Sequence, residues 1–165
     1  MSGTDPALAW APDDPIRGRM VFVSGVGLPS AVDQLTPALQ VYGGGCIPQL
    51  RERLGGHPEY RARVRILCAG HGVVHADTET LVDHRRMTER RRDELKPTVK
   101  KTLLAEFGRD GVPREVLVMA EHPYTGLIDF VFHIPGLLPK SALHSPIPDL
   151  TWSWAAAVLD RWGWP

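Results

Sequence analysis

The sequence predicts an α/β domain of three layers, in which helices cover both faces of a mainly parallel sheet of four to five strands. Short runs of apolar and β-branched residues end at glycine or polar residues, as strands buried on both faces do. Segments with helical spacing lie between these runs, so the alternation predicts right-handed crossovers. With 165 residues, 43% of them hydrophobic, the chain can bury a core without a disulfide or a metal.

Four apolar runs are strand candidates. Valine, isoleucine, leucine and phenylalanine dominate them, and turn-forming or polar residues follow. Residues 130–134 end at Pro135-Gly136, and the apolar segment before them fits a helix equally well. The other three, with the residues that stop them, are 19–24 before Gly25-Val-Gly27, 64–69 before Gly70-His-Gly72 and 115–120 before Glu121-His-Pro123.

The first predicted helix, residues 46–54, follows the first strand. Ile47, Leu50 and Leu54 share one helix face, and Pro48 fits the first turn. The stretch before the first strand, residues 1–18, contains three prolines and reads as an extended arm, which leaves 19–165 as one α/β domain.

Two longer helices are predicted towards the C-terminus. Residues 88–107 have Thr88 as an N-cap and Gly108 as a stop, and Pro97 predicts either a kink or two helices. Residues 148–162 form the last predicted helix. Its apolar face is formed by Trp154, Val158 and Trp162, which we expect to pack in the core or in a homodimer contact rather than at a membrane.

The charge balance excludes several classes of protein. Lys plus Arg and Asp plus Glu are 19 each, which argues against a dedicated nucleic-acid binder. No apolar run approaches the roughly 18 residues of a membrane span, and residues 1–14 lack the basic start and apolar stretch of a signal peptide. The two cysteines cannot form a disulfide framework or a four-ligand zinc site. We therefore expect a cytoplasmic protein with reduced thiols and no membrane partner.

The ends of the predicted strands indicate where a ligand binds. In open parallel sheets, ligands occupy the crevice beyond the carboxyl ends of the strands. Three such exits, at Ser24-Gly-Val-Gly27, Gly70-His-Gly72 and Glu121-His-Pro-Tyr124, carry glycine or polar residues. We therefore expect these exits to lie side by side and to line the site.

The segment from Cys68 to Arg85 is the densest in chemically active residues, and three interpretations of it compete. His71 with Asp77 or Asp83 would be an acid/base or substrate-orienting set. His71 and His75 with an acid would bind a metal only if a helix placed both rings on one face, which the glycines disfavour. In the third interpretation the segment is a structural loop whose acids cap turns and the following helix.

This segment, Ile66-Leu-Cys-Ala-Gly-His-Gly-Val-Val-His-Ala-Asp-Thr-Glu-Thr-Leu-Val-Asp83, resembles the signature of a family of small bacterial and phage domains of unknown function. Three further blocks resemble that family in the same order: Val21-Phe-Val-Ser24, Leu39-Gln-Val-Tyr-Gly43 and Val116-Leu-Val-Met-Ala-Glu-His-Pro-Tyr124. Together the blocks span about residues 20 to 140. The family is similar to Rossmann-like domains that process nucleosides, so the resemblance implies a Rossmann-like fold and a nucleoside or nucleobase ligand.

The departures from the family pattern are specific. The family's lysine before the histidine is Gly70 here, its lysine-rich turn is Gly25-Val-Gly-Leu-Pro29, and its glycine at the third exit is Glu121. The positions that match are Ser24, Tyr42, Gly43, His71, Gly72, Asp77, Asp83 and Tyr124.

Glu121 is the most informative departure. It follows an apolar strand, so we expect its carboxylate to be partly desolvated and to face a second acid, Asp77 or Asp83. Two such carboxylates suit glycosidic cleavage, one as nucleophile or water-activating base and the other as acid or sugar anchor. Tyr42 or Tyr124 would stack on a base. The alternative is that Glu121 caps the following helix.

The sequence-based hypothesis is an enzyme that hydrolyses or transfers at the N-glycosidic bond of a nucleoside or nucleotide, without cofactor or metal. The alternatives are a non-catalytic nucleotide- or partner-binding module, and a metal enzyme using the histidines. A glycine-rich turn, Tyr42-Gly-Gly-Gly45, and Arg85 or Arg86 are further candidates for holding a phosphate. The expected catalytic residues are His71, Asp77, Asp83 and Glu121; those expected to bind substrate are Ser24, Gly25, Tyr42, Gly43, Gly72, Arg85 and Tyr124.

Overall fold

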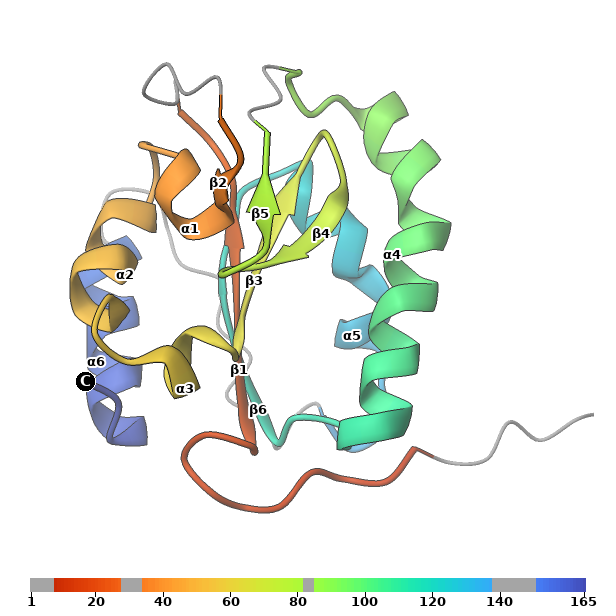
Figure 1. Ribbon diagram of the computed structural model, residues 1–165. Helices are drawn as coiled ribbons and strands as arrows, with labels where there is room; N and C mark the ends of the chain where they lie inside the picture. The colour runs from red at the N-terminus through yellow and green to blue at the C-terminus, as the bar shows by residue number, and fades with distance from the viewer. Residues whose placement is uncertain (1–7, 28–33, 82–84, 138–150) are drawn as a thin grey trace, which may run out of the picture.

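The computed structural model describes residues 8–27, 34–81, 85–137 and 151–165 as a mixed α/β fold around a four-stranded, mostly parallel sheet (Figure 1). The strand order is β4-β3-β1-β6. The strands are β1 Arg19–Ser24, β3 Val64–Cys68, β4 Gly72–His75 and β6 Glu115–Met119. The sequence prediction of β1, β3 and β6 is confirmed to within one residue at each end.

The register of the sheet places β1 at its centre. Val21 lies opposite Val64 of β3 and Leu117 of β6, and both neighbours run parallel to β1. The strand β4 is antiparallel to β3, with Cys68 opposite Gly72. The segment expected to be a long polar loop therefore begins as a hairpin, because Gly72 has a φ of +80° and reverses the chain directly.

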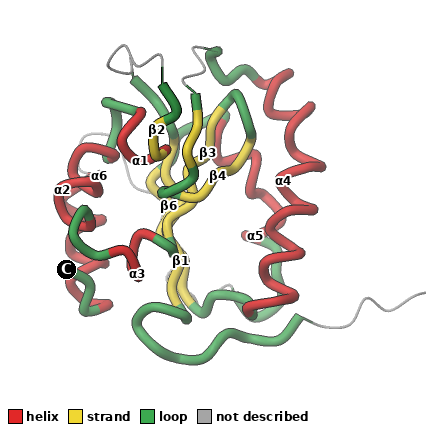
Figure 2. Tube along the Cα trace, in the orientation of Figure 1, coloured by secondary structure: helices red, strands yellow, loops and turns green. Residues whose placement is uncertain are grey.

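A second, two-stranded ribbon pairs β2 with β5, and the remaining elements are helices (Figure 2). The ribbon strands are β2 Thr36–Pro37 and β5 Glu79–Thr80, which are antiparallel. The helices are α1 Ala38–Val41, α2 Ile47–Leu54, α3 Pro58–Arg61, α4 Glu89–Asp110, the 3-10 helix η1 Tyr124–Ile128, α5 Asp129–Phe132 and α6 Thr151–Trp162.

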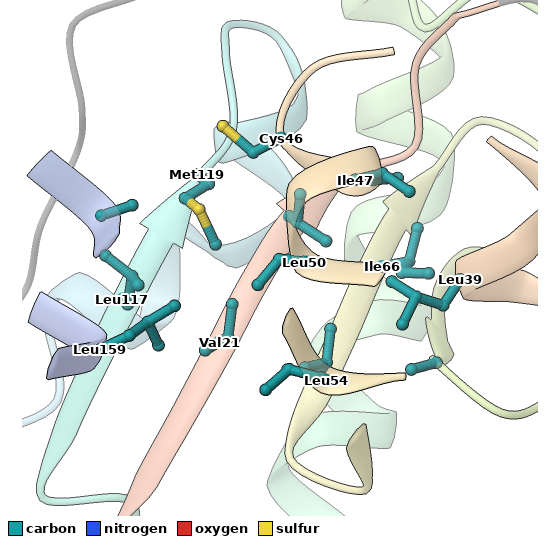
Figure 3. Packing of buried hydrophobic residues seen from close by; sticks show 14 of the residues in the cluster. Val21, Leu39, Cys46, Ile47, Leu50, Leu54, Ile66, Leu117, Met119 and Leu159 are labelled. Atoms are coloured by element: carbon teal, nitrogen blue, oxygen red, sulfur yellow. The ribbon is translucent and has the colours of Figure 1, made fainter. Parts of the chain in front are cut away.

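One side of the sheet, the first face, packs against α1, α2 and α6. The side chains of alternate strand positions point to it, as Val21, Ile66 and Leu117 do. Figure 3 shows these residues meeting Leu50 of α2 and Leu159 of α6. Because apolar residues recur at helical spacing in α2, the predicted helix face is the face that the sheet buries.

The opposite side, the second face, packs against α4, η1 and α5. Phe22 and Val118 of the sheet belong to the same buried cluster as Leu103 and Phe107 of α4 and Leu127 of η1. In Figure 1 the helices of the two clusters lie on opposite sides of the sheet. Both faces of the central strand β1 are therefore dry, which explains its uninterrupted apolar sequence.

The candidate strand at 130–134 is wrong. These residues lie in α5 and the turn after it, and η1 leads directly into α5. Leu127, Ile128 and Val131 are fully buried, with the spacing of three to four that a helical face requires rather than the alternation of a strand. The alternative that the apolar segment before this run is helical is confirmed by η1.

Helix α4 is one helix through Pro97, so the prediction of two helices is wrong. The predicted N-cap is confirmed, because the Thr88 hydroxyl accepts a hydrogen bond of 3.0 Å from the backbone N–H of Arg91. The helix ends at Gly111, with a φ of +90°, and not at Gly108.

Both ends of the described chain pack on the body. The backbone of Ala11 donates to the Val112 carbonyl at 2.9 Å, so this part of the predicted arm is held by the loop before β6. At the other end, Trp162 and Trp164 are buried, and the Trp164 indole donates to the Pro15 carbonyl at 2.6 Å. These two tryptophans serve the core of their own chain, whereas Trp154 is 38% exposed and does not share their buried face.

Candidate functional site

The carboxyl ends of β3, β1 and β6 meet at one edge of the sheet, as the sequence predicts, because the three strands are parallel neighbours. Beyond β1 the chain enters α1 and α2 on the first face. Beyond β6 it enters η1 and α5 on the second face. The exits of two adjacent strands thus diverge, which creates the kind of switch point where α/β sheets hold ligands. We call this edge the carboxyl edge.

At the exit of β1, Ser24 and Gly25 are buried, and Gly25 lies beside Tyr42. Strand alternation directs the Ser24 side chain to the second face. Gly25 is required by packing, since a Cβ there would lie 2.9 Å from the Tyr42 ring. Tyr42 is 5% exposed and belongs to the core of the first face, so its ring is a wall behind Gly25 rather than an open surface for a base.

The glycine-rich turn after α1 supports this exit through its backbone. The Gly44 N–H donates to the Val26 carbonyl at 2.9 Å, and Gly43 beside it is exposed. Gly27, with a φ of +93°, comes so close that a Cβ would lie 2.4 Å from the Gly44 nitrogen. The two glycine segments therefore pack closely against each other. The Gly44 N–H already binds the Val26 carbonyl, so the turn has one N–H fewer to offer a phosphate.

Gly27→Ala is expected to lower the free energy of unfolding by about 2 kcal/mol or more, because it adds a backbone clash to a left-handed conformation. The matched control is Gly108→Ala. Gly108 lies inside α4 with open space around it, so alanine there is expected to raise stability by about 0.5–1 kcal/mol. Urea unfolding of both variants measures the difference; equal effects would contradict the close approach.

At the exit of β3, His71 is exposed in the hairpin turn. Its Nε2 lies 3.1 Å from the Thr80 hydroxyl, which itself donates to the Leu81 carbonyl at 3.0 Å. Because that hydroxyl has a single proton, His71 donates its Nε2–H to Thr80. The β5 ribbon strand thus orients His71 at the carboxyl edge.

The other residues at the β3 exit are in contact with helix α4. A Cβ at Gly72 would lie 2.6 Å from a Val99 methyl group, so this glycine permits α4 to pack. The Arg91 guanidinium donates to the Ala69 carbonyl at 2.8 Å. The packing of α4 thus explains the glycine at position 72, and the bond from Arg91 satisfies the Ala69 carbonyl. Neither feature requires a ligand.

At the exit of β6, Glu121 is exposed and Tyr124 is buried. The partial desolvation expected for Glu121 is therefore not observed. Burial, and then the negative charge of Glu121, raise the pKa of the Tyr124 hydroxyl, and a hydrogen bond with the Met87 backbone opposes them. Tyr124 is accordingly a neutral O–H group at the pH of a cell, held beside a carboxylate.

The start of α4 joins two of the exits. Arg91 binds the β3 exit, and Glu89 lies 3.2 Å from the His122 ring at the β6 exit. Since β1 lies between β3 and β6, the start of α4 crosses the second face above the end of β1. Tyr124 and Met87, which lies just before α4, consequently belong to the same buried cluster at this edge.

Asp77 is not brought to this edge. The register continues β4 away from the carboxyl edge, and the Ala76 N–H binds the Val64 carbonyl at the start of β3. Four residues of β3, roughly 13 Å, therefore separate Asp77 from the His71 turn. The Asp77 carboxylate pairs with Arg61 of α3 at 2.8 Å.

The other two predicted residues of this segment have different outcomes. Asp83 lies outside the described residues. Arg85 is exposed just before α4, on the side of the molecule where α4 meets the carboxyl edge.

A triad of polar residues, the buried Arg65 and Glu106 with the exposed His75, was missed by sequence reasoning. Arg65 of β3 donates to Glu106 of α4 at 3.0 Å, and both residues are less than a tenth exposed. His75 of β4 donates to the other oxygen of Glu106 at 2.5 Å. The signal was Arg65, a charged residue inside an apolar strand, which folding must pair.

The pKa of Glu106 lies below its ordinary value of 4.5. Burial alone would raise this pKa, but hydrogen bonds from His75 and Arg65 and the charge of Arg65 outweigh burial. The triad lies on β3, β4 and α4, away from the three strand exits, so we assign it to stability. It pins the edge strand β4 and helix α4 to the sheet.

Acidification is expected to release part of this stability. A carboxyl group whose pKa is lower in the folded state stabilises above its unfolded pKa, and that contribution is lost as the pH falls through the folded pKa. The free energy of unfolding of the parent should therefore fall below about pH 4.5, and more steeply than that of Glu106→Gln. Chemical denaturation from about pH 3 to pH 7 compares the slopes; parallel curves would contradict the assignment.

Within the described ranges, no three histidine, cysteine, aspartate or glutamate side chains gather as metal ligands. His71 and His75 instead bind Thr80 and Glu106, at different places on the hairpin. The described helices include none long and apolar enough to cross a bilayer. Comparison of the chain with protein-family models, with curated proteins and with solved structures finds no match.

Proposed function

We propose that the carboxyl edge binds a nucleoside or nucleotide and that Glu121 serves the hydrolysis of its N-glycosidic bond. The observation that carries this proposal is that the exposed Glu121 carboxylate acts electrostatically on the buried Tyr124 hydroxyl where the exits of β1 and β6 diverge. The proposal includes a Rossmann-like, three-layer arrangement of the fold, in which such a divergence is the usual ligand position.

Each group of the carboxyl edge has a role in this reaction. The Glu121 carboxylate accepts a proton from water as the water oxygen bonds to the anomeric carbon. The bond from that carbon to the base nitrogen breaks, and the nitrogen receives a proton. Tyr124 is a neutral donor at this edge, and Thr80 orients the His71 ring there. The negative charge of Glu121 also stabilises the positive charge that develops on the sugar.

A non-catalytic binding module is the second candidate, and a specific observation favours it. The predicted partner acid Asp77 lies at the other end of β3 in an ion pair with Arg61. Among the predicted carboxylates that the structure describes, Glu121 is then the only one at the carboxyl edge. A binding module would use the same carboxyl edge without needing a second carboxylate.

The test is a thermal-shift and product screen of the purified chain against nucleosides, nucleoside monophosphates and free bases, with and without a chelator. Ligand at a hundredfold excess over its Kd stabilises the folded state by about 2.7 kcal/mol, which a melting shift detects. A shift with release of free base supports the enzyme. A shift without product supports the binding module, and no shift with any compound overturns both. Loss of turnover on chelation would favour a metal enzyme.

A further inference from the structure

Arg86 differs from most arginines of this protein, because none of the described residues binds its guanidinium. Arginine side chains elsewhere bind backbone carbonyls or carboxylates and thereby hold elements together. Those arginines are Arg51, Arg53, Arg61, Arg63, Arg65 and Arg91. Arg86 is exposed and has no ion pair or hydrogen bond with another described residue.

The backbone holds Arg86 at the carboxyl edge. The next residue, Met87, is 5% exposed, lies in the core of the second face, and binds the Tyr124 hydroxyl through its backbone. Arg86 and Glu121 both act electrostatically on that same hydroxyl. The two charged side chains are therefore both near Tyr124, and among the described residues they form no ion pair with each other.

Across the described part of the chain, this arrangement leaves the fork of N–H donors of the Arg86 guanidinium unbound where the ligand is expected. A guanidinium matches a phosphate group, which it binds through two parallel N–H···O bonds. The neighbouring N-terminus of α4, already capped by Thr88, adds a partial positive charge on the same side. Glu121 would repel a phosphate, so in this proposal the phosphate contacts Arg86 and the scissile bond lies at Glu121.

We propose that Arg86 binds the phosphate of the substrate, so that the protein acts on nucleoside monophosphates in preference to nucleosides. This inference rests on the proposed function and assigns the substrate class at the same carboxyl edge. Arg86 is then a specificity-determining residue. The fold holds Met87, and with it the position of Arg86, before a ligand arrives.

The test measures the affinities of nucleoside monophosphates and of the matching nucleosides by calorimetry, and their turnover where it occurs. In Arg86→Gln, the preference for the monophosphate is expected to fall about ten- to hundredfold, the usual effect of one charge-assisted hydrogen bond or two. Arg86→Lys keeps the charge and loses the fork, so it should retain part of the preference. Inorganic phosphate should compete with the monophosphate in the parent and less in Arg86→Gln.

The matched control is Arg90→Gln. Arg90 is exposed one turn further along, where it pairs with Glu94 at 3.4 Å, so its removal lowers the local charge equally and should keep the preference. Equal binding of nucleosides and monophosphates by the parent would overturn the phosphate site while leaving the proposed function intact. If Arg90→Gln lost the monophosphate preference as fully as Arg86→Gln, the preference would be a general electrostatic attraction, and the phosphate site at Arg86 would be overturned. Binding of neither class would instead overturn the proposed function.

Discussion

Glu121→Gln is expected to lower kcat by about a hundred- to ten-thousandfold, the usual contribution of a general base. The amide keeps the size of the side chain but can neither accept the proton of the attacking water nor stabilise a positive sugar. Because Glu121 is exposed, the substitution should leave the fold intact. Release of free base, measured under single-turnover conditions together with ligand affinity, separates this chemical loss from a loss of binding.

Asp77→Asn distinguishes the sequence prediction from the structure. The sequence predicts that Asp77 acts with His71, whereas the structure pairs it with Arg61 at the far end of β3. We therefore expect Asp77→Asn to turn over substrate at the parental rate and to lose at most about 1 kcal/mol of stability, as exposed ion pairs do. If both variants kept parental activity, the glycosidic mechanism would be wrong. If Asp77→Asn alone were inactive, our placement of the site would be wrong.

Arg65→Met is expected to lower the free energy of unfolding by about 3–5 kcal/mol, the largest effect on stability that we predict. Methionine matches the apolar stem of arginine but leaves the Glu106 carboxylate buried with His75 as its remaining partner. It also removes a donor from the Ala62 carbonyl, 2.7 Å from Arg65. Urea unfolding at neutral pH measures the loss.

The double variant Arg65→Met/Glu106→Leu should recover much of that loss, since no uncompensated charge then remains buried. Glu94→Gln is the matched control on the same helix. It removes an exposed partner of Arg90 and Arg91 and should cost less than about 1 kcal/mol. A loss in Arg65→Met no greater than in Glu94→Gln would show that the triad does not stabilise the fold.

Elements whose cause is local could be predicted. The apolar runs of β1, β3 and β6 are strands because their residues are dry on both faces, and a continuous apolar sequence records that directly. Thr88 caps α4 through a bond within its own first turn. The three strand exits meet because the strands are parallel neighbours. The sequence therefore placed Ser24, His71 and Tyr124 at the carboxyl edge, where the structure has them.

Elements whose cause is distant could not be predicted. Residues 130–134 have the apolar composition of a strand. They pack in one cluster with helix α4, however, which provides no strand for them to pair with. Pro97 and Gly108 are helix breakers by propensity, yet packing of Leu103 and Phe107 on the sheet carries α4 past both.

The sequence by itself determined the parallel strands, the main helices and the edge at which their exits meet, because apolar periodicity and capping act over a few residues. Only the tertiary structure decided which charged residues lie close together. The antiparallel turn at Gly72 carries Asp77 away from His71 and towards Arg61, and it brings His75 to Arg65 and Glu106. Such partners lie on different elements, so strand register and helix packing, rather than spacing along the chain, set the distances between them.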